Sequence, residues 1–187
     1  MRIGFCGTMS VGKTTLVNAL KEYDEFKDYE FRTERSKYLS SLGIPLNTDS
    51  TLKGQTIFLS ERCVELMKID IITDRTIIDV MAFANNAKSI PVYKAEKFEE
   101  YASLFLWSYD HIFYVSPKGV EIENNGIRET NPEYRDKIDK TINQLLKKYN
   151  DRGNIRNLYK LSGSIEDRIK KVIDITTYSK ASHNIYK

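Results

Sequence analysis

The amino-acid sequence predicts a three-layer α/β fold, with a five-stranded parallel sheet between two layers of helices. Two observations predict it. Short apolar or β-branched runs alternate with helical patterns along nearly the whole chain of 187 residues, as in sheets whose strands are joined by crossover helices. A glycine-rich turn also follows the first apolar run and leads directly into a helical pattern. We expect one domain over residues 1–187, because the chain is long enough to bury a sizeable core.

Five runs of apolar and β-branched residues have the length and composition of strands. They cover residues 2–6, 29–33, 68–73, 111–115 and 158–161. Cys6, in the first run, is expected to be a buried strand residue.

Apolar residues recur at steps of three and four between these runs, which predicts amphipathic helices. One helix follows the glycine-rich turn, another follows residue 75, and two more cover 51–67 and 131–149. A further helix is predicted to begin at Ser164, a residue type that caps helices, and it has acidic residues in its first turn. The positions that define these helices are Leu16, Val17 and Leu20; Leu52, Thr56, Leu59, Cys63 and Leu66; Tyr134, Ile138, Ile142, Leu145 and Tyr149; and the acidic Glu166 and Asp167. Residues 178–187 form a polar tail that is expected to fray.

The stretch GFCGTMSVGKTT, residues 4–15, has the spacing of a phosphate-binding loop, or P-loop: Gly7, four residues, then Gly12, Lys13 and Thr14. Glycines let the backbone N–H groups of such a turn approach phosphate oxygens closely. Lys13 would reach the terminal phosphates, and the Thr14 hydroxyl would bind Mg²⁺, which prefers oxygen ligands. The nucleotide-binding residues predicted here are Gly7, Thr8, Met9, Ser10, Val11, Gly12, Lys13, Thr14 and Thr15.

Composition sets broad limits on function. The net charge of +3, from 29 basic and 26 acidic residues, is too small to require a nucleic-acid partner, although it does not exclude one. Two cysteines do not predict a disulfide framework, and no apolar run approaches membrane-spanning length. We therefore expect a cytoplasmic protein with no membrane partner.

Further motifs resemble those of the P-loop nucleoside and nucleotide kinases. Asp74 and Arg75 end the third predicted strand, and Glu34 and Arg35 follow the second, as acidic and basic pairs do in that family. The stretch NGIRETNPEYRDKID resembles the lid of the ribosylnicotinamide kinase branch, except that Asn125 stands where that branch has Asp. LYKLSGSIEDRIKKV is similar to the strand and loop that pass the adenine. The resemblance implies the strand order 2-3-1-4-5 and a lid at about 116–135.

The resemblance also implies roles for individual residues, because phosphoryl transfer needs a phosphate cradle, a metal, cations and a group that orients the acceptor. The implied catalytic residues are Lys13, Glu34, Asp74, Arg75 and Arg128. Thr14 and Asp74 are the implied Mg²⁺ ligands. Beyond the P-loop, ATP would contact Arg128, Arg135, Ser162, Gly163 and Ser164. The acceptor would contact Glu34, Arg35, Gln55, Arg75 and Asp79.

Structural alternatives stay open for several of these residues. Asp74 and Arg75 could form a salt bridge at a strand end, and Glu34 could be the first-turn acid of the next helix. Arg135 lies in a run of alternating charges, where a solvated helix face is the usual finding. Gln55 is equally compatible with a half-exposed position.

The same holds for the remaining residues near these motifs. Asp79 and Asn86 could line the acceptor site, but an exposed helix face is the simpler expectation. The aromatic residues Phe58, Tyr38 and Phe83 are assigned to core and rim rather than to base stacking. His111 and His183 have no metal-ligand spacing and receive no role.

The expected function is transfer of the γ-phosphate of ATP to a nucleoside or nucleoside monophosphate, with ribosylnicotinamide and deoxynucleotides as the leading acceptors. A monophosphate needs an additional anion site, for which Arg35, Arg62 or Arg75 are candidates. By analogy a homodimer is also expected. Two alternatives stay open. A kinase acting on a hydroxyl in DNA, RNA or a modified base would use the basic cluster Lys147, Lys148, Arg152 and Arg156. A non-catalytic nucleotide-binding switch is the other, although the guanine motif Asn-Lys-x-Asp is missing.

Overall fold

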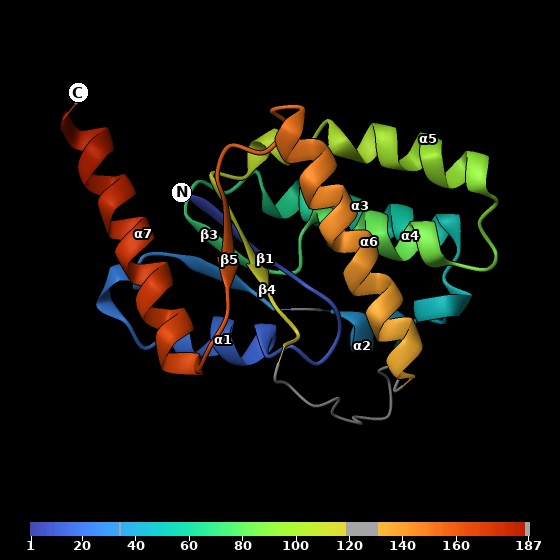
Figure 1. Ribbon diagram of the computed structural model, residues 1–187, viewed down its shortest axis with the longest axis horizontal. Coiled ribbons are helices and arrows are strands. Elements are labelled where there is room, and N and C mark those ends of the chain that lie inside the picture. Colours follow the sequence, from blue (N-terminus) through green and yellow to red (C-terminus); the bar gives the residue numbers. More distant parts are fainter. Residues whose placement is uncertain (34, 119–130, 186–187) are drawn as a thin grey trace.

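A five-stranded parallel sheet forms the centre of the molecule (Figure 1). The computed structural model describes residues 1–33, 35–118 and 131–185, without the side chains of 182–185. The strands are β1 (Arg2–Cys6), β2 (Glu30–Arg32), β3 (Ile71–Asp74), β4 (His111–Val115) and β5 (Leu158–Leu161). Their order is β2-β3-β1-β4-β5, and every pair is parallel. The predicted fold class and strand order are confirmed.

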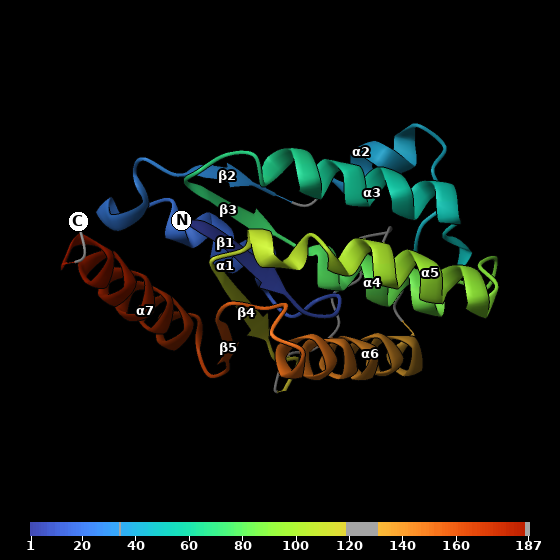
Figure 2. The ribbon, with the colours of Figure 1, turned by 90° about the horizontal axis from the view of Figure 1, so that it is seen from above.

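Helices cover both faces of the sheet, which makes three layers (Figure 2). On one face lie α1 (Lys13–Leu20) and α7 (Ile165–Ile185). On the other lie α3 (Leu52–Glu65), α4 (Ile77–Asn86), α5 (Val92–Ser103) and α6 (Pro132–Asp151). The short helix α2 (Ser36–Ser41) follows β2, and single 3₁₀ turns cover Asp24–Phe26, Asn47–Asp49 and Leu106–Ser108.

The core divides into two clusters, one on each face, because successive strand residues point to opposite sides. Ile3 and Phe5 pack with the cluster that includes α1 and α7, whereas Cys6 packs with the cluster beneath α3 to α6. In β4, Phe113 and Tyr114 divide in the same way. The burial predicted for Cys6 is confirmed, and the P-loop is anchored to a rigid strand.

The structure differs most clearly from the predicted elements in three places. β3 begins at Ile71 rather than Lys68, because 68–70 are exposed and turn away from the end of α3. α7 continues through most of the tail that was expected to fray. The sequence analysis assigned no helix to α5, although its residues Ala95, Phe98 and Ala102 are buried.

Among the described residues, no helix is both long and apolar enough to cross a membrane.

Candidate active site

The P-loop joins the end of β1 to the start of α1, at the carboxyl edge of the sheet. Gly7 packs so closely against β4 that an added Cβ would lie 2.6 Å from the carbonyl oxygen of Val115. Gly12 has a φ of 82° and is the N-cap of α1, and in the described structure no capping side chain accepts a hydrogen bond from the first N–H groups of this helix. The first N–H groups of α1 therefore lack an intrahelical acceptor, and they suit an anion.

Lys13 is folded back onto this loop. Its ammonium Nζ donates to the carbonyl oxygens of Gly7 at 2.6 Å and Thr8 at 2.7 Å, and the side chain is buried. Burial lowers the pKa of Lys13, and the neighbouring charge of Arg75 lowers it further. Asp79 and Asp74 oppose both effects. A buried cation beside uncapped amides provides the charge that terminal phosphates need.

Thr14 and Asp74 come together between the first turn of α1 and the end of β3. The Thr14 hydroxyl donates to Asp74 Oδ2 at 2.5 Å. Asp74 is almost fully buried, and its Oδ1 atom has no hydrogen-bond partner in the described part of the chain. A hydroxyl and a carboxylate at this spacing are hard oxygen donors of the kind that Mg²⁺ takes alongside phosphate oxygens. The two side chains therefore fit a magnesium ion held with a nucleotide.

Asp79 occupies a buried structural position, which corrects the expectation of an exposed helix face. Its Oδ2 accepts from the backbone N–H and hydroxyl of Thr76 and so caps α4, while Oδ1 accepts from the N–H of Gly7 at 3.1 Å. Asp79 therefore ties the P-loop to α4. Asn86 is buried as well, and it donates to Thr141 of α6.

Arg75 directly follows Asp74 and has a backbone φ of 81°, in the left-handed region. For a residue with a Cβ this conformation costs on the order of 1–3 kcal/mol, and it persists only where neighbouring groups hold it. The Arg75 guanidinium lies over the ring of Phe83, 4.9 Å from its centroid. The strand end thus places Asp74 beside Thr14 and Arg75 in an adjacent pocket.

This partly open pocket lies between α3, α4 and the segment after α2, and its cavity volume is about 40 Å³. Its wall includes Gln55, Phe58, Arg75, Asp79, Val80 and Phe83. Gln55 is only 3% exposed, so the half-exposed alternative is wrong. Phe58 and Phe83 pack in the core, as predicted, and they also line the cavity. Apolar walls with a few polar groups are the usual make-up of small-molecule pockets.

Two arginines proposed for the acceptor site are engaged elsewhere. Arg35 forms an ion pair with Glu61 at 3.0 Å and lies over Tyr38, and it does not line the pocket that holds Gln55. Arg62 was a candidate anion site, but it is 4% exposed and pairs with Glu65 at 2.7 Å. Burial raises the pKa of Glu65, and the charge of Arg62 counteracts the rise.

Two further arginines brace the P-loop from outside. Arg135 of α6 donates to the carbonyl oxygen of Ser10 at 3.4 Å and is 8% exposed, so the solvated-face alternative is wrong. Arg168 of α7 donates to the next carbonyl, that of Val11, at 2.8 Å. Burial lowers the pKa of Arg168. Arg168 was not predicted as a site residue, although it lies four positions before the buried Val172 on the same helix face.

The segment proposed to pass the adenine joins β5 to α7. Gly163 has a φ of 89°, and Ser164 and Asp167 exchange hydrogen bonds that cap α7. The capping role predicted for Ser164 is confirmed. Since Arg168 lies in the first turn of the same helix, residues 162–164 are held near the P-loop. Glu34 and Arg128, two of the proposed catalytic residues, lie outside the described residues, as does most of the proposed lid.

Solved structures with similar folds include two kinases. Deoxyadenosine kinase from M. mycoides, with products dCMP and a flexible dCDP bound, aligns with a TM-score of 0.63 and 16% identity, over 95% of this chain and 99% of that one. The complex of the same enzyme with dATP aligns with a TM-score of 0.61 and 17% identity, over 95% of this chain and 100% of that one. Thymidylate kinase from Candida albicans aligns with a TM-score of 0.66 and 15% identity, over 95% of this chain and 91% of that one. The predicted resemblance to the P-loop kinase fold is confirmed.

Comparison at the level of sequence gives a narrower result. No curated protein matches the chain significantly. The model of a protein family described as AAA domain matches residues 2–168, which include the P-loop, Asp74 and Arg168. The chain therefore belongs to the AAA domain family.

Proposed function

We propose that this protein is a kinase that uses ATP and Mg²⁺ to phosphorylate a nucleoside or nucleoside monophosphate. One observation carries the proposal: consecutive residues at the end of β3 belong to both halves of such a site. Asp74 contacts Thr14 of the P-loop, and Arg75 lines the pocket that contains Gln55. A donor phosphate on the loop and an acceptor in the pocket would meet at this strand end.

The residues at this site provide the charge and positioning that phosphoryl transfer requires. The uncapped amides of α1 and the Lys13 ammonium bind the donor phosphates, and Arg75 provides a cation on the acceptor side. Thr14 and Asp74 would hold Mg²⁺ with the nucleotide, and the ion, when bound, would neutralise charge on the phosphates. Glu34 is proposed to orient the acceptor hydroxyl, and Arg128 to close over the transferring group. The arrangement favours the transition state because these charges are in place before transfer begins.

The pocket favours a nucleobase as the group that it recognises. Phe58 and Phe83 provide flat apolar surfaces, and Gln55 brings an amide that both donates and accepts hydrogen bonds. No hydrogen bond of this amide is seen within the described ranges 1–33, 35–118 and 131–185. A buried amide of this kind gains from a ligand that pairs with it.

Among nucleosides and their monophosphates, the arrangement of arginines favours the nucleoside. Of the three candidates for an acceptor phosphate, Arg35 pairs with Glu61, and Arg62 pairs with Glu65. Arg75 lines the pocket, where its guanidinium also lies over Phe83. The narrower resemblance to ribosylnicotinamide kinases, the cytoplasmic location and the homodimer stay predictions.

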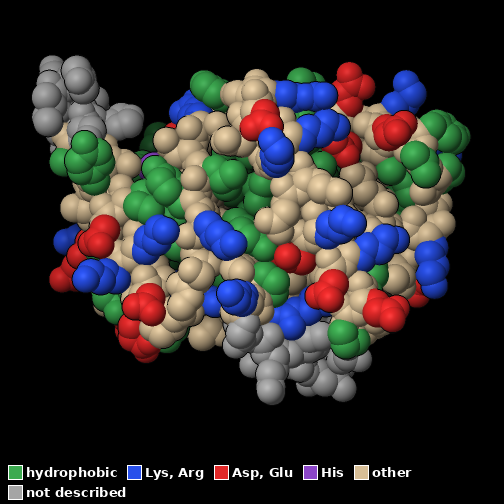
Figure 3. Space-filling model, in the orientation of Figure 1, with side chains coloured by type: hydrophobic (Ala, Val, Ile, Leu, Met, Phe, Trp, Pro, Cys, Tyr) green, Lys and Arg blue, Asp and Glu red, His purple; other side chains and the backbone are tan. Residues whose placement is uncertain are grey.

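A kinase acting on DNA or RNA is the weaker alternative. In the basic cluster proposed for it, Lys147 pairs with Asp151, Lys148 with Glu99, and Arg156 with Asp110. On the face that Figure 3 presents, acidic side chains are interspersed among the basic ones. Nucleic-acid binding would show a steep dependence on salt, because each phosphate contact releases counterions. Absence of that dependence would exclude this alternative.

The experiment that tests the proposal is an acceptor screen with ATP, MgCl₂ and separate nucleosides, their monophosphates, ribosylnicotinamide and short DNA. Release of ADP that depends on one nucleoside or monophosphate would support the proposal and identify its acceptor. If short DNA alone raised ADP release, the polynucleotide alternative would replace it. Tight ATP binding with no acceptor-dependent turnover would favour the nucleotide-binding switch.

Gln55→Leu is expected to weaken acceptor binding without weakening ATP binding. The substitution keeps the volume of the side chain but removes its hydrogen-bonding groups, a loss of about 1–3 kcal/mol where a partner group is left unpaired. We therefore expect an increase of about tenfold or more in the acceptor KM. Gln144→Leu on the exposed side of α6 is the matched control. An equal rise in the KM for ATP would argue against a base-reading role.

A further inference from the structure

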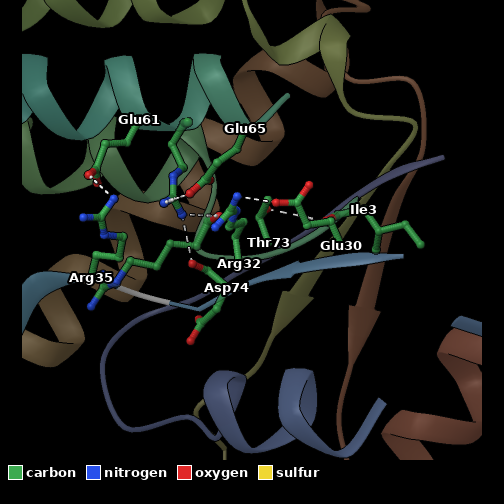
Figure 4. A network of polar contacts seen from close by, with 10 residues as sticks. Ile3, Glu30, Arg32, Arg35, Glu61, Glu65, Thr73 and Asp74 are labelled. Atoms are coloured by element: carbon green, nitrogen blue, oxygen red, sulfur yellow. Dashed lines mark hydrogen bonds and ion pairs between the residues drawn. The ribbon is translucent and has the colours of Figure 1, made fainter. Parts of the chain in front are cut away.

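Arg62 of α3 is a buried cation whose hydrogen bonds converge on the end of β3. Its guanidinium Nη1 lies 3.1 Å from the carbonyl oxygen of Asp74 and 3.4 Å from that of Arg75, and its Nη2 binds Glu65 Oε1 at 2.7 Å. Figure 4 shows this network, with Glu65 on α3 facing the strand that carries Asp74. The exposed fractions of the Arg62 and Glu65 side chains are 4% and 9%.

The two carbonyl groups that Arg62 binds flank the strained backbone of Arg75. A φ of 81° is unfavourable for an arginine, so this conformation needs interactions that are lost when the backbone relaxes. Hydrogen bonds from a charged guanidinium to the carbonyls on either side of Arg75 are such interactions. The conformation of Arg75 is therefore coupled to the side chain of Arg62.

A buried ion pair contributes little net free energy to the stability of a helix by itself. Removing two charges from water costs more than their attraction returns unless hydrogen bonds satisfy the remaining donors and acceptors. Arg62 also lies on the stripe of α3 that includes the buried Leu59, where an apolar residue would pack at lower cost. An arginine at this position is better explained by the backbone that it holds.

We infer that Arg62 is a positioning residue which, with Glu65, holds the Asp74–Arg75 strand end in the geometry that the metal and the acceptor require. This inference rests on the proposed function. Arg62 touches neither substrate: it sets the direction of the backbone from which Asp74 reaches Thr14 and Arg75 reaches the pocket. The same helix carries Gln55 and Phe58, so α3 links the acceptor pocket to the magnesium-facing carboxylate.

The test compares Arg62→Met, Arg62→Lys and Glu65→Gln with a matched control, Glu99→Gln. The Glu99 side chain is also 9% exposed and also pairs with a cationic nitrogen at 2.7 Å, here that of Lys148, but it lies among α4, α5 and α6, away from β3. All variants should lose thermal stability, because each disturbs an ion pair that contains a buried carboxylate. The informative readout is ATP binding by calorimetry, with and without MgCl₂, which needs no acceptor.

Arg62→Met is expected to lose about tenfold or more of the affinity that Mg²⁺ adds to ATP binding, a typical coupling between sites. Binding without Mg²⁺ should change by no more than about twofold, because the P-loop amides and Lys13 do not depend on Arg62. Arg62→Lys should restore part of the loss, Glu65→Gln should show a smaller loss, and Glu99→Gln should show none. A crystal structure of Arg62→Met should show the φ of Arg75 returning to a negative value.

The inference is overturned if Arg62→Met keeps the wild-type effect of Mg²⁺, if Glu99→Gln loses as much, or if wild-type ATP binding does not depend on Mg²⁺. Should Arg62→Met fail to fold, Glu65→Gln and Arg62→Lys decide by the same criteria. Failure of the proposed function looks different. No acceptor would then be phosphorylated, while the loss of Mg²⁺ coupling in Arg62→Met would still be measured.

Discussion

Lys13→Ala is expected to reduce phosphate transfer by about a thousandfold or more, the scale on which preorganised charge at a reaction centre contributes to catalysis. The Lys13 ammonium is buried and hydrogen-bonded to two carbonyl oxygens of the loop that would hold the donor phosphates. With phosphates bound on this loop, the ammonium would lie beside the groups whose negative charge moves during transfer. The measurement is the rate of acceptor-dependent ADP release under saturating ATP.

The fold should survive this substitution. Burial of the Lys13 ammonium is itself unfavourable, as its lowered pKa indicates, and the loop remains anchored through Asp79 and Arg168. Lys13→Met, which fills most of the space of the lysine stem, is the control for packing. If Lys13→Met transferred phosphate at the wild-type rate, or if both variants unfolded, Lys13 would be a structural residue rather than a catalytic one.

Asp74→Asn is expected to lower transfer by about a hundredfold or more, comparable to the loss of a group that stabilises charge directly. Asparagine has the same shape and can still accept the hydrogen bond from Thr14, but it is a much weaker ligand for Mg²⁺. The loss should be partly recovered as the MgCl₂ concentration is raised. The measurement is the transfer rate as a function of MgCl₂.

Asp174→Asn, on the exposed side of α7, is the control for loss of an acidic residue. If Asp74→Asn reduced the rate equally at every MgCl₂ concentration, that result would contradict the role of Asp74 as a metal ligand. That outcome would favour the alternative in which Asp74 and Arg75 only stabilise the strand end. Thr14→Ala should resemble Asp74→Asn if the two side chains share one metal.

The parts of the fold and site that depend on local pattern could be predicted from the sequence. The spacing of the P-loop identifies Gly7 and Gly12, because only glycine fits the backbone at these two positions, and Lys13 follows from the same motif. The runs of apolar residues define the bounds of β1, β4 and β5 closely. The strand order came from the resemblance to a known family. It is not a property that the residues of one strand encode.

The parts that depend on long-range packing could not be predicted. Asp79 suggested an exposed helix face, but it is buried because it caps α4 and binds the P-loop, 72 residues earlier in the chain. Arg62, Arg135 and Arg168 each occupy the buried stripe of a helix. Hydrophobic patterning treats a basic residue on such a stripe as an exception, whereas here each one donates to a backbone carbonyl near the nucleotide site.

Following the γ-phosphate itself tests the proposed phosphoryl transfer most directly. The protein is incubated with MgCl₂, the nucleoside or monophosphate identified in the acceptor screen and ATP whose γ-phosphoryl oxygens carry ¹⁸O, and the products are analysed by mass spectrometry. We predict that this acceptor gains one phosphoryl group that retains the label, and that Lys13→Ala forms none of this product. Label that is found only in free phosphate, or that remains entirely in ATP, would contradict the proposal that this chain is a nucleoside or nucleoside monophosphate kinase.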